Sequence, residues 1–216
     1  YGLVCVGLVL RLLPETLSPD LRLKLPPIVL LSRYLELLKH GSFVSNALIT
    51  AFSTFLSFSY LTAASPIFIN GFGFTPFQFS MLFGLFALFM IGASQLNGVL
   101  VSRFNPGNVL KSAIFLSSCG SLLLLGLSLW IGQHPAQVHE APLTVIVLIA
   151  LMLLTLAPTG MIYPTAAMGA LTDHARIAGT ASALMGTMQY VFGAAAGLLV
   201  GLIAKLPSSS SGTPLP

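Results

Sequence analysis

The sequence has very little charge. Only 6% of its 216 residues are Asp, Glu, Lys or Arg, whereas 56% are hydrophobic, and the mean hydropathy is +0.95. Water-soluble domains carry about 25% charged residues, so this composition argues against a soluble globular fold. It predicts an all-α polytopic protein whose main partner is the lipid bilayer.

Acidic residues are the scarcest charged groups. All five, Glu15, Asp20, Glu36, Glu140 and Asp173, fall outside the long apolar segments. A proton relay or a cation site inside a membrane normally needs an intramembrane carboxylate. We therefore do not expect this chain by itself to couple transport to protons.

Cysteines and metal-binding patterns are also scarce. Cys5 and Cys119 both lie in apolar runs, where they are expected to pack as small side chains and not to form a disulfide. The spacing of His134, His139 and Glu140 fits no structural zinc pattern, so this stretch is expected to be a solvated loop. We expect neither a metal nor another cofactor.

Enzyme motifs and nucleic-acid-binding patterns are missing as well. The sequence contains no P-loop, G-x-S-x-G, H-E-x-x-H or C-x-x-C motif, and all four histidines fall in predicted loops. The net charge of +4 is not concentrated in a basic cluster with interleaved aromatic residues. We therefore expect neither an enzyme nor a nucleic-acid-binding protein.

Long apolar segments predict five membrane-spanning helices, because each is long enough to cross a bilayer. Thr75 and Pro76 are typical of a helix N-terminus at the start of the second span. Residues 1–13 are apolar but short, and are expected to be the end of a truncated helix. Residues 14–40 and 205–216 are expected to be loops. The expected spans are residues 41–70, 76–102, 109–131, 143–171 and 178–204.

The basic residues predict the orientation of these spans. If the loops alternate between the two sides of the membrane, one side carries eight basic residues and the other carries only Lys205. Loops rich in Lys and Arg face the cytoplasm, so the first side is predicted to be cytoplasmic. Its basic residues are Arg11, Arg22, Lys24, Arg33, Lys39, Arg103, Lys111 and Arg176.

A polar stripe follows one face of the span at 41–70. Its members recur at helical spacing, so they share one side of the helix. We predict that this face lines an aqueous or substrate cavity. The alternative is that the hydroxyls bond back to their own helix and pack against neighbours. The stripe consists of Asn46, Thr50, Ser53, Ser57, Tyr60 and Ala64, and Asn46, Ser53, Ser57 and Tyr60 are its candidate substrate-binding residues.

Five glycines form a stripe along the span at 178–204, which is expected to let a neighbouring backbone approach within a bundle. Gln189 and Tyr190 lie beside the stripe and are candidate substrate-binding residues, although Gln189 also suits an interhelical hydrogen bond. The glycines are Gly179, Gly186, Gly193, Gly197 and Gly201.

Two further spans carry polar groups near their middle. In the span at 76–102, Gln95 shares a face with Gly98, is expected to point towards close packing, and is a weaker candidate for substrate binding. In the span at 143–171, Tyr163 lies between Pro158 and Pro164, which are expected to interrupt the helix. Prolines free backbone carbonyls, and these need a partner from the protein or a cavity.

Several runs together resemble the Bcr/CflA branch of the major facilitator superfamily. LLPETL at 12–17 is similar to the end of that family's sixth helix. The similarity extends in the same order over nearly the whole chain. The other runs are SYLTAASPIFI at 59–69, GFTPFQFSMLFG at 73–84, SQLNGVLVSRF at 94–104, GMIYPTAAMGAL at 160–171 and AGTASALMGTMQYVFGAAAGLLVG at 178–201.

The resemblance implies a two-lobed exporter of twelve helices in a bacterial inner membrane. Such a protein moves drugs and other small amphipathic solutes outward in exchange for protons by alternating access, and is expected to be a monomer. This chain would be the end of helix six, the central cytoplasmic loop at 14–40, and helices seven to eleven of the C-terminal lobe. The external loop at 205–216 would precede a missing final helix, and the proton-coupling acid would lie in the missing N-terminal lobe.

The resemblance also points to a loop motif between helices eight and nine. Gly98 and Arg103 match its glycine and its first basic residue. Ser102 replaces the acid, and Gly107 and Asn108 stand where basic residues are usual. The gating salt bridge of the motif is therefore not expected here. Two alternatives remain for the whole chain: a metabolite or sugar facilitator of the same superfamily, and a non-transporting half-protein that needs a partner subunit.

Overall fold

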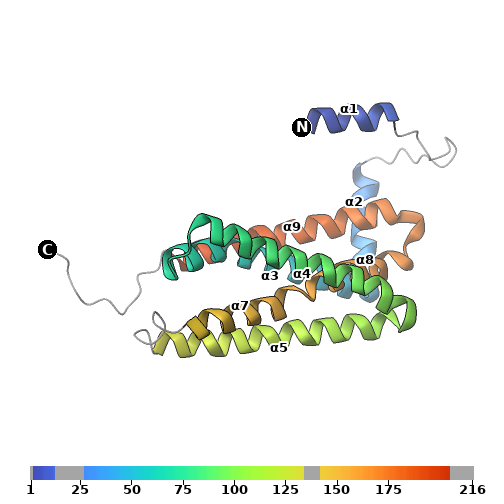
Figure 1. Ribbon diagram of the computed structural model, residues 1–216. Helices are drawn as coiled ribbons and strands as arrows, with labels where there is room; N and C mark the ends of the chain where they lie inside the picture. Colours follow the sequence, from blue (N-terminus) through green and yellow to red (C-terminus); the bar gives the residue numbers. More distant parts are fainter. Residues whose placement is uncertain (1, 13–26, 134–141, 205–216) are drawn as a thin grey trace.

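The structure, a computed structural model, describes residues 2–12, 27–133 and 142–204, and every regular element within these ranges is helical. Figure 1 shows their arrangement. The α-helices are α1 (Gly2–Leu12), α2 (Pro27–Leu37), α3 (Gly41–Ser65), α4 (Pro76–Arg103), α5 (Pro106–Gln133), α7 (Pro142–Leu156), α8 (Thr159–Thr172) and α9 (Ala178–Ile203). Two short helices complete them, the π-helical turn η2 (Pro66–Gly71) and the 3-10 turn η3 (Ala175–Ile177).

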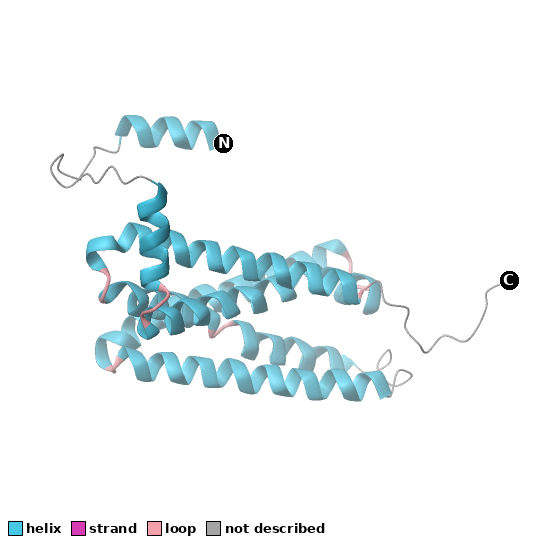
Figure 2. Cartoon of the chain, turned by 180° about the vertical axis from the view of Figure 1, so that it is seen from behind, coloured by secondary structure: helices cyan, strands magenta, loops and turns pink. Residues whose placement is uncertain are grey.

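Five helical segments are long and apolar enough to cross a membrane, which confirms the predicted polytopic all-α fold. They are α3 with η2, α4, α5, α7 with α8, and α9, and they run side by side with their turns at the two ends of the bundle (Figures 1 and 2). The short helix α2 crosses one end of the bundle and contacts α9. No residue of α1 is buried.

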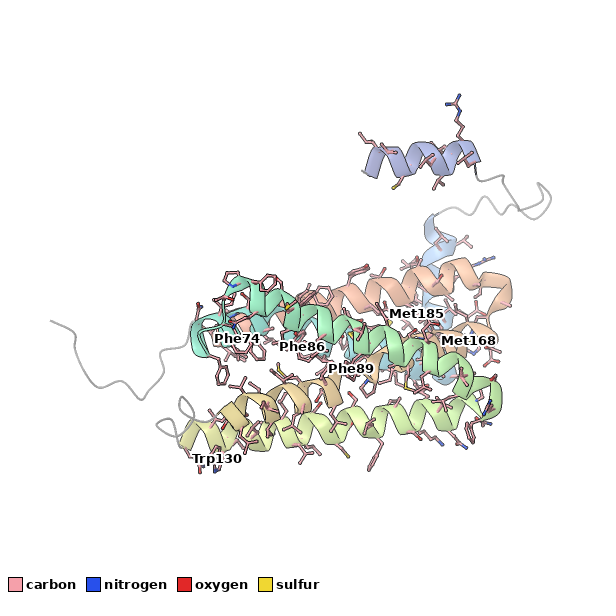
Figure 3. The ribbon with its side chains drawn as sticks, viewed as in Figure 1. Phe74, Phe86, Phe89, Trp130, Met168 and Met185 are labelled. Atoms are coloured by element: carbon pink, nitrogen blue, oxygen red, sulfur yellow. The ribbon has the colours of Figure 1, made fainter. Side chains whose placement is uncertain are left out.

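Helices α3 and α8 form the centre of the bundle. Helix α3 packs against α9 on one side and α8 on the other, while α8 also contacts α4 and α5. Two buried apolar clusters lie along this centre. One includes Phe86 of α4 and Met152 of α7, and the other includes Phe43 of α3 and Met185 of α9 (Figure 3 labels Phe86 and Met185). The outer faces remain apolar, as expected for surfaces that contact lipid.

The start of α4 follows directly from its sequence. Gly73 precedes it with a φ of 69°, a left-handed conformation that other residues rarely adopt. The Thr75 hydroxyl accepts a hydrogen bond from the Gln78 backbone N–H at 3.2 Å, and the Gln78 side chain accepts one from the Thr75 N–H at 2.9 Å. This reciprocal cap, with Pro76 at the first helical position, confirms the predicted N-terminus.

Two prolines of the fourth span have different effects. Helix α7 ends at Leu156 and α8 begins at Thr159, so the predicted interruption near Pro158 is confirmed. Pro164, in contrast, lies inside α8 and does not end it, contrary to expectation. The fourth span is therefore two helices with a single break, visible in Figure 1 between α7 and α8.

The break leaves a backbone carbonyl that α5 satisfies. Pro158 has no N–H to continue the helical ladder, and no backbone hydrogen bond to the Thr155 carbonyl crosses the break in the described residues. The Ser117 hydroxyl of α5 donates to the Thr155 carbonyl at 2.8 Å, and both residues are buried. Gly120 lets α5 approach, because a Cβ atom there would lie 2.9 Å from the Thr155 nitrogen. A carbonyl that lacks a partner inside a bilayer is costly, so this contact stabilises the break.

The closest backbone approaches lie at different glycines from those predicted. A Cβ atom at Gly160 would collide with the Met90 carbonyl of α4, which shows that α4 and α8 touch backbone to backbone. On α9, a Cβ at Gly193 would lie 3.2 Å from the Phe58 ring, and one at Gly197 would lie 3.7 Å from the Thr62 hydroxyl. No atom of the described residues would lie within 4 Å of a Cβ at Gly179, Gly186 or Gly201.

Helix α9 is consequently at the edge of the described bundle and is not surrounded by it. Its contacts run mainly along α3, and only Ala181, Met185, Gly193 and Ala196 are buried. The helix is rotated so that the buried face includes Gly193, while Gly179, Gly186 and Gly201 lie away from α3. Whether a small residue mediates packing depends on where the neighbouring helix lies, and spacing alone does not fix that position.

We predict that Ser117→Ala destabilises the protein, because it leaves the Thr155 carbonyl without its donor. Hydrogen bonds between membrane helices contribute about 0.6 kcal/mol on average, and up to about 1.7 kcal/mol. Thermal or denaturant unfolding in detergent micelles measures the change. Ser121→Ala is the matched control, since the Ser121 hydroxyl donates to the Ser117 carbonyl of its own helix. Equal stability of the two variants would contradict the prediction.

We predict that Gly160→Ala destabilises the protein by about 1–3 kcal/mol, because the added methyl group must push α4 away from α8. Gly186→Ala is the control, since a Cβ there meets nothing in the described residues and Ala has the higher helix propensity. Unfolding of both variants in the same detergent checks the difference. A tolerated Gly160→Ala would show that α4 and α8 do not touch at this point.

Candidate functional site

A groove lies between α4, α8 and α9, and we call it the α4–α8–α9 groove. It has a volume of about 510 Å³. Its walls are largely apolar, with three polar side chains, and no charged residue lines it. The lining residues are Met90, Ile91 and Ser94 of α4, Gly160, Tyr163, Pro164 and Ala167 of α8, and Gln189 of α9.

The side chain of Tyr163 is held in the groove by α3. Its hydroxyl donates to the Thr54 hydroxyl at 2.8 Å, and the Thr54 hydroxyl donates in turn to the Thr50 carbonyl at 2.9 Å. Thr54 is buried, so this link lies in the centre of the bundle. The Tyr163 ring is therefore fixed, and its oxygen can still accept a hydrogen bond from a solute.

Two other polar side chains of the groove are available to hydrogen-bond a solute. Within the described ranges, neither Ser94 of α4 nor Gln189 of α9 makes a side-chain hydrogen bond. Ser94 is exposed and Gln189 is half-buried. An amide group at membrane depth is stable only when it faces protein or water. Gln189 thus offers both a donor and an acceptor to a molecule in the groove.

The position of the break in the fourth span shapes the groove. Because α8 restarts at Thr159, Gly160 and Tyr163 lie on its first turns, where Gly160 contacts the Met90 backbone. This contact closes the seam between α4 and α8. Pro164 and Ala167 continue the wall with small, rigid side chains. The result is a groove whose apolar wall carries one polar side chain from each of α4, α8 and α9.

The polar stripe of α3 does not line this groove. Asn46 lines a second pocket between α3, α4, α5 and α8, and Ser53 lines a third pocket next to α5. The Ser57 hydroxyl donates to the Ser53 carbonyl at 3.0 Å, which is the alternative that the sequence left open. Helix α3 packs on both sides, so its polar face is divided among several environments.

Tyr60 lies in an apolar setting. It packs edge-on against Phe86 with the ring centroids 4.9 Å apart, beside the buried cluster that contains Ala64 and Phe68. Its hydroxyl is buried, and no hydrogen-bond partner for it exists in the part of the chain that the structure describes. A buried hydroxyl without a partner costs free energy, so Tyr60 does not resemble the tethered Tyr163.

Of the two amides near the middle of α4, the structure buries Asn97 and not Gln95, which we expected to point towards close packing. Asn97 is 6% exposed and accepts a hydrogen bond from the Thr165 hydroxyl at 3.0 Å. Gln95 is exposed, and a Cβ at Gly98 would meet nothing within 4 Å, so the expected close packing at this face is not observed. The face of α4 that meets α8 runs through Ser94 and Asn97.

The remaining predicted residues lie on the surface. Tyr190 is 71% exposed and does not line the groove, although it follows Gln189 directly. Arg103 is exposed at the end of α4, and no ion pair involves it within the described ranges. The side chain of Trp130 lies near the end of α5 (Figure 3).

Sequence reasoning found Gln189 but missed Ser94 and Asn97. Tyr163 carried a signal, because it lies beside two prolines in an apolar span. Ser94 and Asn97 carried little, since single small polar residues are common in such helices. In the described residues no group of three or more His, Cys, Asp or Glu side chains could hold a metal ion. His134, His139 and Glu140 lie outside those residues.

Comparison with known proteins agrees with the membrane fold. The model of the Major Facilitator Superfamily matches residues 1–198. The chain is 29% identical over 202 residues to a "Bicyclomycin resistance protein homolog" of Haemophilus influenzae, covering 92% of this chain and 47% of that protein. It is 26% identical over 201 residues to "Uncharacterized MFS-type transporter YdgK" of Bacillus subtilis, covering 93% and 47% respectively. No solved structure matches it significantly.

The chain spans about half the length of these two curated relatives. The bicyclomycin resistance homolog agrees with the predicted resemblance to the Bcr/CflA branch. The family model covers four of the five spans completely and most of α9. This chain therefore belongs to the major facilitator superfamily of membrane transporters.

Proposed function

We propose that this chain forms most of the C-terminal lobe of a drug exporter that exchanges its substrate for protons by alternating access. In this proposal residues 41–204 supply helices seven to eleven, residues 14–40 the central cytoplasmic loop, and residues 205–216 an external loop. The match to about half of each relative supports this division. The substrate would bind in the α4–α8–α9 groove, facing the other lobe.

The observation that carries the proposal is the chemistry of the groove. Apolar walls with three uncharged polar side chains, Ser94, Tyr163 and Gln189, suit an amphipathic solute with a few hydrogen-bonding groups. A sugar facilitator needs hydrogen bonds around the whole solute, which three groups on one side supply poorly. The groove therefore favours the exporter over the metabolite or sugar facilitator.

Proton coupling is assigned to the other half of the exporter. The two acidic residues that the structure describes, Glu36 and Asp173, lie in α2 and after α8, outside the five spans. A spanning segment without a carboxylate has no side chain that readily carries a proton at neutral pH. This lobe then contributes the substrate wall, while the acid that binds the proton lies elsewhere in the protein.

The distribution of basic residues supports an orientation in a bacterial inner membrane. Lys39, Arg103 and Lys111 lie beside the ends of α3, α4 and α5 that share one end of the bundle with α2 (Figure 1). By the positive-inside rule this end faces the cytoplasm. The opposite end, which carries the α4 cap at Thr75, then faces outward.

We predict that Gln189→Leu in the full-length exporter reduces efflux of amide- and hydroxyl-bearing substrates by about three- to tenfold, because one hydrogen bond contributes about 1 kcal/mol. Efflux of substrates that lack amide and hydroxyl groups should change little. Transport into inverted membrane vesicles with a panel of fluorescent and radiolabelled drugs measures the profile. Gln189→Asn, which keeps the amide, should lose less.

Thr187→Val on the same helix is the matched control, because the Thr187 hydroxyl is exposed and donates to the Ala183 carbonyl of its own helix. If Gln189→Leu leaves every substrate unaffected, the groove is not the binding site. If it abolishes accumulation of the folded protein, Gln189 has a structural role instead.

We predict that Tyr60→Phe leaves efflux unchanged and stabilises the protein slightly, by up to about 1 kcal/mol, because it removes a buried hydroxyl without a partner. Tyr163→Phe, which breaks the link to Thr54, should lower stability or alter the substrate profile. Unfolding and vesicle transport test both variants. Loss of efflux in Tyr60→Phe would instead support the prediction from the sequence that Tyr60 contacts the substrate.

A further inference from the structure

A second polar site lies closer than the groove to the end of the bundle that carries α2, and we call it the asparagine pocket. It has a volume of about 280 Å³ and lies between α3, α4, α5 and α8. It shares no lining residue with the α4–α8–α9 groove. Its polar lining consists of Ser42, Asn46, Asn97, Thr165 and Thr172.

Asn97 presents an unused hydrogen-bonding group to this pocket. The side chain is 6% exposed, and its Oδ1 accepts the hydrogen bond from Thr165. In the described part of the chain its Nδ2 has no acceptor. This nitrogen is not among the fully enclosed side-chain atoms, so it opens to the pocket. The residue is largely buried but this atom is accessible, so a ligand or a water molecule in the pocket can accept its hydrogen bond.

Asn46 presents the complementary group. Its Nδ2 donates to the Ser42 carbonyl at 2.9 Å, and a carbonyl can only accept, so this amide has a defined orientation. Its Oδ1 has no donor among the described residues. Gly169 makes room for the amide, because a Cβ there would lie 2.9 Å from that oxygen. The pocket thus contains a free acceptor on α3 and a free donor on α4.

The pocket opens towards the end of the bundle that carries α2. Ser42 lies at the start of α3, Gly107 at the start of α5 and Thr172 at the end of α8, and all three residues are exposed. These helix ends lie together in Figure 1. No charged side chain lines the interior of the pocket. At its mouth the Ser42 hydroxyl donates to the Asp173 carboxylate at 3.4 Å. Entry is therefore from the aqueous side, and a solute that reaches Asn97 leaves this carboxylate behind.

We propose that the asparagine pocket binds a small uncharged solute that carries a carboxamide, with its carbonyl on Asn97 and its N–H on Asn46. A carboxamide fits both orientations of the Asn97 side chain. If the Asn97 amide is reversed, Thr165 accepts its N–H and Asn97 presents an acceptor, which the second N–H of a primary carboxamide satisfies. A carboxylate offers only hydrogen-bond acceptors, and an ammonium ion offers only donors, so neither can bind both Asn97 and Asn46 in this way.

The test uses the full-length transporter in lipid nanodiscs with ¹⁵N-labelled asparagine, titrated with 2-pyrrolidinone, which has an adjacent N–H and carbonyl. The side-chain amide signals are assigned by their loss in Asn97→Asp and Asn46→Asp. We expect a saturable shift of the Asn97 signal, with a dissociation constant on the order of millimolar. N-methyl-2-pyrrolidinone, which lacks the donor, should bind at least about fivefold more weakly.

Asn70, exposed at the opposite end of the bundle, is the internal control, and its signal should not saturate. Equal, non-saturating shifts of Asn97 and Asn70 with both lactams would overturn the proposal, because they would report a solvent effect. An unchanged Asn97 signal would also overturn it, and water would then be the occupant. The Asp variants serve only to assign the signals. The two ligands are compared on the unmodified protein, so the measured affinities depend neither on the stability of a variant nor on transport.

Discussion

A backbone carbonyl released inside a membrane has to find a donor within the protein, and this requirement shapes the fourth span. Pro158 interrupts the helical ladder, and the Ser117 hydroxyl of α5 occupies the Thr155 carbonyl. That contact requires α5 to lie close, which Gly120 permits. Once α7 is fixed against α5, α8 restarts in the centre of the bundle. Its first turns then meet α4 at Gly160 and α3 through Tyr163.

Most hydroxyls in the spans bond to their own helix and so carry no information about a cavity. Thr54, Ser57, Ser59 and Thr62 of α3 each donate to the carbonyl four residues earlier. Such bonds are available in any helix, whatever surrounds it. The exceptions are informative because they cross between helices. Ser117 reaches Thr155, and Thr165 reaches Asn97 over the seam between α4 and α8.

The sequence was sufficient to predict the five spans, because length and hydropathy decide whether a helix crosses a bilayer. It also predicted the cap at Thr75, which depends on neighbouring residues alone. It did not predict how each helix is rotated about its axis. The α3 stripe and the α9 glycines are real periodicities, but the neighbours that cover a face are set by long-range packing. Asn97 and Gln95 differ by two positions, and only the packing of α4 on α8 decides which one is buried.

The groove and the asparagine pocket lie along one face of α4 but use their amides differently. In the groove, the Gln189 side chain on the edge helix α9 makes no hydrogen bond to the described residues, so a solute can exchange there without breaking an internal bond. In the pocket, Asn46 and Asn97 each use one atom to hold the protein and leave the other open. An occupant that joins these two free atoms links α3 to α4 across α8. Because α4 and α8 also line the groove, such an occupant would fix the distance between these two helices there.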